Sequence, residues 1–148
     1  MISALYRRWR RSDGNALVEF VVLSVVLLLP SLYLVLTLAS VQSAVFAADI
    51  IARDTARIHA TVQDPELAQQ RSAEHTRLVL EDFGLQGSDV VEIACSDDPC
   101  ASSGGTVAAT VRIPVPVPGL GPVLGQDGPI AVSSGHSVQV DQYRAGNG

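Results

Sequence analysis

The apolar run from Ala16 to Ala48 constrains the fold of this chain more than any other feature of its sequence. Glu19 is the only Asp, Glu, Lys, Arg or His within it. A helix crosses the hydrocarbon core of a bilayer with about 20 apolar residues, and this run is longer than that. It predicts a membrane-spanning helix and, in a chain of 148 residues, leaves room for one small domain beyond it.

Charge is divided unevenly about this run. The N-terminal block carries four arginines, Arg7, Arg8, Arg10 and Arg11. Basic residues before a first membrane helix stay in the cytoplasm, so they predict an extracytoplasmic C-terminal domain. From Asn15 onward, six arginines stand against fourteen acidic residues, a balance of −8. Because so acidic a region repels phosphates, we expect no nucleic-acid partner and interpret the arginines as a topology signal.

The helix is expected to continue past the bilayer, from Asn15 to about His59. At about 1.5 Å per residue it would be roughly 65 Å long. Asp49 and Arg53 form an acid-to-base pair four residues apart, which indicates that the helix has left the lipid there. Pro30 lies inside the apolar run and is expected to kink or loosen the helix.

A second helix is expected from Pro65 to about Phe83. Asp64 is a suitable N-cap, Pro65 suits the first turn, and Gly84 suits the C-terminal cap. The residues expected to face the core are Leu67, Leu78, Val79 and Phe83, and those expected to be solvated are Glu74, His75 and Glu81.

The pattern changes from helical to β after Gly87. Strands are expected from Asp89 to Cys95, from Val107 to Val115, and from about Ile130 to Tyr143. The segment from Pro116 to Pro122 is typical of a loop, and Pro114 indicates that the second strand ends at a sheet edge. Two helices followed by three strands predict an α+β fold with a small antiparallel sheet.

The expected organisation has four parts. Residues 1–14 form a basic leader, and residues 15–60 form a transmembrane and extended helix. Residues 61–144 form an extracytoplasmic α+β domain, and residues 145–148 form a disordered tail.

Cys95 and Cys100 are the two cysteines of the chain. An extracytoplasmic location favours a disulfide between them, which would close a small loop. Two free thiols are the alternative. A metal site needs more soft ligands, and the three histidines lie in separate segments, so we expect no metal.

The segment from Asp13 to Phe20 places an acid, Glu19, near the lipid edge. Intramembrane carboxylates are costly and are candidates for function, although the helix macrodipole or nearby headgroups also favour an acid there. Basic residues, a glycine, four residues and then Glu-Phe opening an apolar helix resemble the class III signal of type IV prepilins. The resemblance implies that a prepilin peptidase cuts between Gly14 and Asn15, which leaves Glu19 as the fifth mature residue.

Within that superfamily, the stretch from Gly14 to Arg57 is similar to the TadE-like pseudopilins of tight-adherence (Flp, type IVc) pilus systems. The shared features are Ala-Leu-Val-Glu-Phe, an apolar stretch broken by Pro30, and a C-terminal end that contains Ala47-Ala48, Arg53 and Ala56-Arg57. The resemblance implies a minor pilin or pseudopilin in which Glu19 pairs with the free amine on Asn15 of a neighbouring subunit. Its implied partners are the prepilin peptidase, other pilin subunits, the pilus assembly machinery and the membrane.

Three other interpretations remain. A secretory signal cut near residues 43–47 is disfavoured by the length of the apolar run. A signal-anchored protein with an extracytoplasmic binding domain would keep its leader. An enzyme is not expected, because the run Ser133-Ser134-Gly135-His136 has no nucleophile elbow around it and Asp97-Asp98 is typical of a turn. We therefore expect no catalytic residue, no cofactor and no small-molecule substrate.

Overall fold

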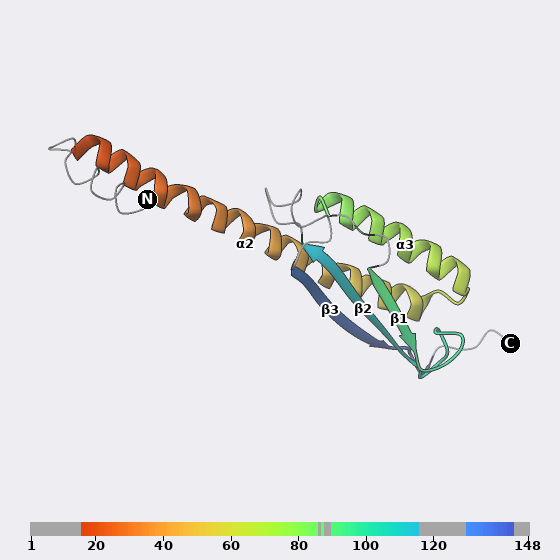
Figure 1. The fold of residues 1–148 in the computed structure, drawn as a ribbon. Helices are drawn as coiled ribbons and strands as arrows, with labels where there is room; N and C mark the ends of the chain where they lie inside the picture. Colours follow the sequence, from red (N-terminus) through yellow and green to blue (C-terminus); the bar gives the residue numbers. More distant parts are fainter. Residues whose placement is uncertain (1–15, 86, 88–89, 116–129, 144–148) are drawn as a thin grey trace, which may run out of the picture. The chain divides into compact units, whose positions relative to one another are not determined.

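The computed structural model describes residues 16–85, 87, 90–115 and 130–143. The helices are α2 (Ala16–Thr61) and α3 (Pro65–Asp82), and the strands are β1 (Val91–Cys95), β2 (Thr106–Val115) and β3 (Ile130–Gln139) (Figure 1). The prediction of an α+β fold with a long apolar helix, a second helix and a three-stranded antiparallel sheet is confirmed. The leader, the loop that begins at Pro116 and the tail lie outside the described residues.

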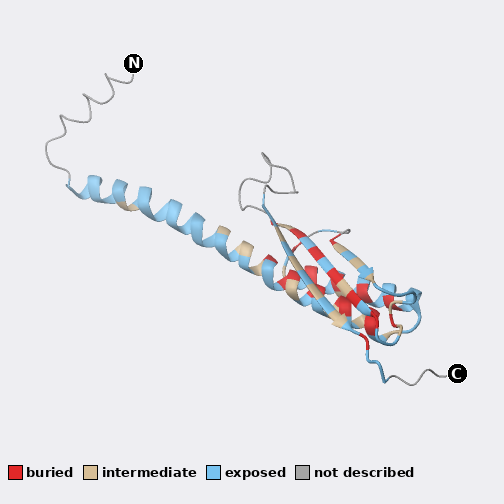
Figure 2. Cartoon of the chain, turned by 90° about the horizontal axis from the view of Figure 1, so that it is seen from below, coloured by how far each residue is buried: buried red, intermediate tan, exposed pale blue. Residues whose placement is uncertain are grey.

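The chain forms two compact units, Met1–Leu36 and Thr37–Gly148, and α2 belongs to both. In the first unit, the described residues are a single stretch of helix with exposed side chains (Figure 2). The helix continues through Pro30. Just after it, the Ser31 hydroxyl donates a hydrogen bond to the Leu27 carbonyl oxygen at 2.7 Å, which satisfies this polar group within the apolar stretch.

In the second unit, the strands pair in the order β1-β2-β3, and both pairs are antiparallel. Val111 of the central strand lies opposite Val91 of β1 and Ser134 of β3. The odd-numbered residues of β2 are buried, and the even-numbered ones are exposed or half-buried. Because successive side chains of a strand point to opposite faces, one face of the sheet covers the core and the other is open.

The core lies between the buried face of β2 and the two helices. Small side chains of α2 recur every four residues and form one buried strip along the helix: Ala44, Ala48, Ala52, Ala56 and Ala60. Helix α3 contributes Val79 and Leu80, and β2 contributes Val111, Ile113 and Val115 to the same cluster. Alanines fill most of the buried positions in this part of α2, and Ile51 is the largest side chain that the helix buries completely.

Both ends of α3 follow the predicted capping. The Asp64 carboxylate accepts hydrogen bonds from the backbone N–H groups of Glu66 at 2.9 Å and Leu67 at 3.3 Å. These bonds satisfy two N–H groups that have no partner within the helix. After the helix, Gly84 has a φ of +64°, a left-handed conformation that glycine adopts without a Cβ clash.

The predicted core face of α3 is correct only in part. Val79 is buried and Phe83 packs against the core cluster, whereas Leu67 and Leu78 are 38% and 46% exposed. The prediction that these two leucines face the core is wrong. The buried positions of α3 are Ala68, Ser72, Thr76, Val79 and Leu80. Three of these five side chains are small, and Ser72 contacts His59 of α2.

The prediction that the second strand ends at a sheet edge near Pro114 holds only locally: β2 is the central strand, but its described pairing with β1 ends at Val111. The Arg112 N–H donates to the Val90 carbonyl oxygen at 2.8 Å, so the even-numbered residues of β2 turn their backbone groups toward β1. Pro114 is the next of these residues, and the described part of the chain has no strand paired with it on that side. Its missing N–H therefore breaks no ladder bond, which explains how a central strand accommodates a proline.

Candidate functional site

The first part of α2 presents an apolar surface that the described chain leaves uncovered. Phe20 is 70% exposed and Leu27 is 72% exposed. The helix is long and apolar enough to cross a membrane, and none of its most apolar stretch is buried. Leaving so many aliphatic side chains in water is unfavourable, so burial of this surface against other apolar groups would be stabilising.

Glu19 lies in the first turn of α2 and is directly followed by the exposed Phe20. A carboxylate at this position is favoured by the positive end of the helix dipole. The predicted cleavage site, Gly14 and Asn15, and the four predicted topology residues, Arg7, Arg8, Arg10 and Arg11, lie outside the described residues. The structure therefore places the acid at the start of a helix that has no other charged residue until Asp49.

In the second unit, a buried histidine joins α2 to α3. The Ser72 hydroxyl donates to the Gln69 carbonyl oxygen at 3.0 Å and lies 3.2 Å from His59 Nε2. With the Ser72 hydrogen on the Gln69 carbonyl oxygen, the His59 tautomer that carries its proton on Nε2 completes this network by donating to Ser72. His59 is 6% exposed, and this burial lowers the pKa of its imidazole.

A second polar contact between α2 and α3 involves His75. Its Nε2 lies 3.0 Å from Asp54 Oδ2, but the geometry is not that of a hydrogen bond. The contact therefore brings a ring nitrogen of α3 close to a carboxylate oxygen of α2. The prediction that His75 is simply solvated is wrong, because the side chain reaches α2 and is only one-third exposed.

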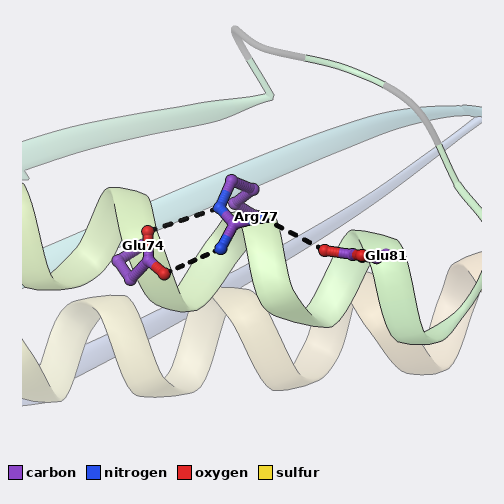
Figure 3. Close-up of polar contacts among 3 residues, drawn as sticks. All are labelled: Glu74, Arg77 and Glu81. Carbon is purple, nitrogen blue, oxygen red and sulfur yellow. Dashed lines mark hydrogen bonds and ion pairs between the residues drawn. The ribbon is translucent and has the colours of Figure 1, made fainter.

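The exposed face of α3 carries an ion-pair network of Glu74, Arg77 and Glu81 (Figure 3). Arg77 contacts Glu74 at 2.8 Å through Nη2 and Glu81 at 3.1 Å through Nη1. The hydrogen bond from Arg77, with the charge of its guanidinium, lowers the pKa of Glu74. Both glutamates are solvated, as predicted, and ion pairs this exposed contribute little to stability.

A groove of about 300 Å³ lies between α2 and β3. Its lining consists of Arg53, Arg57, Ala60, Thr61, His136, Val138, Gln139, Val140 and Asp141. Arg53 pairs with Asp49 at 2.9 Å, as the sequence predicts, whereas Arg57 has no ion pair within the described residues. Sequence reasoning missed this groove because its two walls are distant in the chain. The arginines one turn apart on α2 were its only available signal.

Cys95 and Cys100 form a disulfide with Cα atoms 5.2 Å apart, which confirms that prediction. The loop it closes is hydrogen-bonded to the start of β2. The Thr106 N–H donates to Ser96 Oγ at 2.8 Å, and the Ser96 hydroxyl donates to the Asp97 carboxylate at 2.7 Å. The disulfide therefore stabilises the turn that follows β1 and leads to β2.

In the described ranges, no group of three or more His, Cys, Asp or Glu side chains is placed to hold a metal. Ser134 and His136 share the inward face of β3, opposite Val111 and Ala109 of β2, and Ser133 faces the other way. No hydrogen bond between either serine and His136 occurs in this part of the chain.

No protein-family model, curated protein or solved structure matches this chain. Of the site residues predicted from the sequence, the structure describes Glu19, Phe20, Cys95 and Cys100. The acid and its neighbour belong to the first compact unit, and the disulfide belongs to the second.

Proposed function

We propose that this chain is a prepilin-like membrane subunit, a minor pilin or pseudopilin similar to the TadE-like members of tight-adherence pilus systems. The observation that carries the proposal is the first part of α2, an exposed apolar helix whose first turn holds Glu19. In a helix that serves only as an anchor, the helix dipole offsets part of the cost of a carboxylate at the lipid edge, where ionised groups are unfavourable. A helix that must recognise another subunit also gains from it.

The proposed mechanism begins with removal of the basic leader. A prepilin peptidase cuts between Gly14 and Asn15, and the new α-amine on Asn15 is positively charged at neutral pH. The carboxylate of Glu19 on a neighbouring subunit then pairs with this amine. Because the attraction is strong where water is scarce, it brings the two apolar helices into register, and their side chains cover each other in place of lipid.

In this proposal the subunit sits in the cytoplasmic membrane with its second unit outside the cytoplasm, and it enters a surface pilus or its assembly machine. Three features support the orientation: the arginines before the helix, the acidic balance after it, and the disulfide in the second unit, since disulfides persist in oxidising compartments. The partners are the peptidase, other pilin subunits and the assembly machinery. The chain acts as a structural subunit and not as an enzyme.

A signal-anchored protein that never enters a filament is the competing function. The same apolar helix and the same arginines favour it. It differs in one respect: the leader, with Asp13 and Gly14, stays on the mature chain.

The test is the mass and N-terminal sequence of the mature chain after co-expression with a prepilin peptidase. We expect a chain that starts at Asn15. Gly14→Ala should keep the leader, and so should the wild type with a catalytically inactive peptidase. Ser12→Ala, two residues upstream, is the matched control that should still be cut at Asn15.

Two results would contradict the proposal. An intact leader in the presence of active peptidase would leave the signal anchor. A mature chain that starts near residues 46–48 would identify a secreted soluble domain.

A further inference from the structure

The sheet of the second unit has two edges that are unpaired among the described residues. The Arg112 N–H donates to the Val90 carbonyl, and the Val140 N–H donates to the Gly105 carbonyl, each at 2.8 Å. These bonds show that even-numbered residues of β1 and β3 turn their backbone groups toward β2, so odd-numbered residues turn theirs outward. The outward groups of β1 belong to Val91, Ile93 and Cys95, and those of β3 belong to Ala131, Ser133, Gly135, Ser137 and Gln139.

The edge formed by β3 has none of the features that usually prevent strand addition. It is ten residues long, and its outward-turned positions hold Ala, Ser, Gly and Gln. Proteins block free edges with proline, charged side chains or very short strands, and these are absent from this strand. An edge of this length and composition is suited to receive another strand.

The direction of α2 decides which strand fits. Ala44, Ala48 and Ala52 share a cluster with Ile113 and Val115 at the end of β2, whereas Ala60 packs with Val107 at its start. Helix α2 therefore runs antiparallel to β2, and hence parallel to β1 and β3. If α2 is an anchor, as proposed above, it points the same way in every copy of the chain.

Adding β1 of one copy to β3 of the next makes a parallel strand pair and keeps all α2 helices in the same direction. An antiparallel β3–β3 pair about a two-fold axis would reverse one of the helices. The β1 edge of one copy can therefore pair with the β3 edge of another while both α2 helices keep the single direction that anchoring in one membrane imposes.

Charge complementarity selects the register of this pairing. In a parallel pair, an outward-turned residue of one strand lies opposite an inward-turned residue of the other, so Ser133 lies opposite an even-numbered residue of β1. Arg112 lies opposite Ser133 on β2, and neither Arg112 nor Glu92 has an ion pair in the described chain. With Glu92 of the second copy opposite Ser133, the arginine and the glutamate lie on the same face. Two strand spacings separate their Cα atoms, about 10 Å, and the small serine between them leaves room for the side chains to meet.

We propose that copies of this chain associate edge to edge, with β1 of one copy added to β3 of the next and Glu92 of the first near Arg112 of the second. The inference goes beyond assembly through α2 and rests only on the anchoring part of the proposed function. The contact joins two different surfaces, so it propagates into a row of subunits and does not close at two copies.

Cross-linking of the full chain in membranes tests the pairing directly. Cells co-express two tagged variants, Glu92→Cys and Ser133→Cys, and a short bismaleimide joins cysteines that lie close together. We expect a mixed dimer in high yield, and little homodimer of either variant. Ser137→Cys, four residues further along the same edge, is the positional control and should give a much weaker mixed product with Glu92→Cys. A prominent Ser133→Cys homodimer, or no cross-link in any combination, would overturn the proposal.

Energy transfer between labelled full-length copies in detergent micelles tests the contacts one at a time. Ser133→Pro removes an outward N–H and leaves the bonds to β2 in place, so association should weaken several-fold. Ala131→Pro is the matched control, because its N–H would lie beyond the N-terminal end of the added strand, and it should have little effect. Arg112→Glu and Glu92→Arg should each weaken association roughly threefold to tenfold, and the two reversals together should restore it. Losses that simply add in the double variant would contradict the predicted register.

The same samples separate this inference from the proposed function. None of these substitutions touches Gly14 or Asn15, so the mature N-terminus is scored independently by mass. A processed chain without cross-links rejects the edge contact alone, and a cross-linked chain that keeps its leader rejects only the processing.

Discussion

Before Thr37, α2 carries large aliphatic side chains that the described chain leaves exposed, and after Ala44 it turns a strip of alanines toward its own sheet and α3. The two parts belong to one uninterrupted helix, so they differ in surroundings and not in backbone. Large side chains suit a helix whose neighbours are fluid lipid or other apolar helices. Alanines suit a helix whose neighbours are fixed and close. Side-chain size along the helix thus indicates which part has its partner in the same chain.

The largest effect expected from this comparison comes from two adjacent isoleucines. Ile51 is fully buried and Ile50 is 38% exposed. Ile51→Ala should lower the free energy of unfolding of the second unit by about 2–5 kcal/mol, because it leaves a cavity against the sheet. Ile50→Ala, the matched control, should cost less than about 1 kcal/mol. Pulse proteolysis in urea, with the full chain in detergent, measures both, and equal losses would contradict the packing of this part of α2.

Removal of the disulfide should have the next largest effect, and only in the second unit. In the chain-entropy description, a loop of this size stabilises the folded state by about 2 kcal/mol. Cys95→Ser combined with Cys100→Ser should lose that amount in the same proteolysis assay. The helical content of the first unit, measured by circular dichroism, should stay unchanged. Reduction of the wild type is the control and should reproduce the loss in the double variant.

A smaller effect of opposite sign is expected at Thr55. Its hydroxyl is buried and has no hydrogen-bond partner among the described residues. Thr55→Val keeps the shape and removes the unsatisfied group, so the second unit should gain about 1 kcal/mol. Thr61, whose hydroxyl donates to the Arg57 carbonyl at 2.8 Å, is the control, and Thr61→Val should bring no gain. A loss of stability in Thr55→Val would mean that the hydroxyl has a partner.

The smallest effect concerns pH. Burial lowers the pKa of His59, so on acidification the unfolded chain takes up the proton first. The stability that depends on the neutral imidazole is complete above about pH 6.5, the ordinary pKa of histidine, and declines as pH falls below it. His59→Gln keeps a donor for Ser72 but does not titrate, so its stability should vary less between pH 7.5 and pH 5. The wild type and His59→Gln both keep the Asp54–His75 contact. The difference between their unfolding free energies, measured by urea titration at each pH, therefore reports on His59. Identical pH profiles would contradict the assignment.

The fold was predictable because its signals are local. The capping residues around Pro65, the alternation from Val107 to Val115 and the length of the apolar run each indicate an element without knowledge of its partners. The face of α3 was not predictable in this way. Hydrophobicity favours Leu67 and Leu78 as core residues, but the buried positions of α3 include Ala68, Ser72 and Thr76 instead. Ser72 contacts His59 of α2, a pairing of distant residues that no local pattern indicates.

The candidate site likewise has features that the sequence alone indicates and features that depend on the tertiary fold. The pattern around Gly14 and Glu19 could be recognised from the sequence because it is linear, and the cleavage it predicts stays a prediction. Three features depend on residues that only the tertiary fold brings together: the groove beside Arg57, the contact of His75 with Asp54, and the edge of β3 that is unpaired among the described residues. Pro114 shows the limit most clearly: a proline indicates an edge, yet the strand order that places it beyond the end of β1 is a property of the whole sheet.

The most direct measurement places a photoreactive residue at Leu28, which is 64% exposed on the first part of α2, in cells that hold the complete pilus machinery. A probe at Leu78, exposed on α3, is the control. If the first part of α2 has its partner outside its own chain, the processed protein should cross-link through Leu28 to another pilin subunit. The Gly14→Ala chain should then give lipid adducts only, and the products at Leu78 should not depend on processing. Cross-links from Leu28 to the second unit of the same chain, or identical products with and without leader cleavage, would contradict the proposed role of this helix.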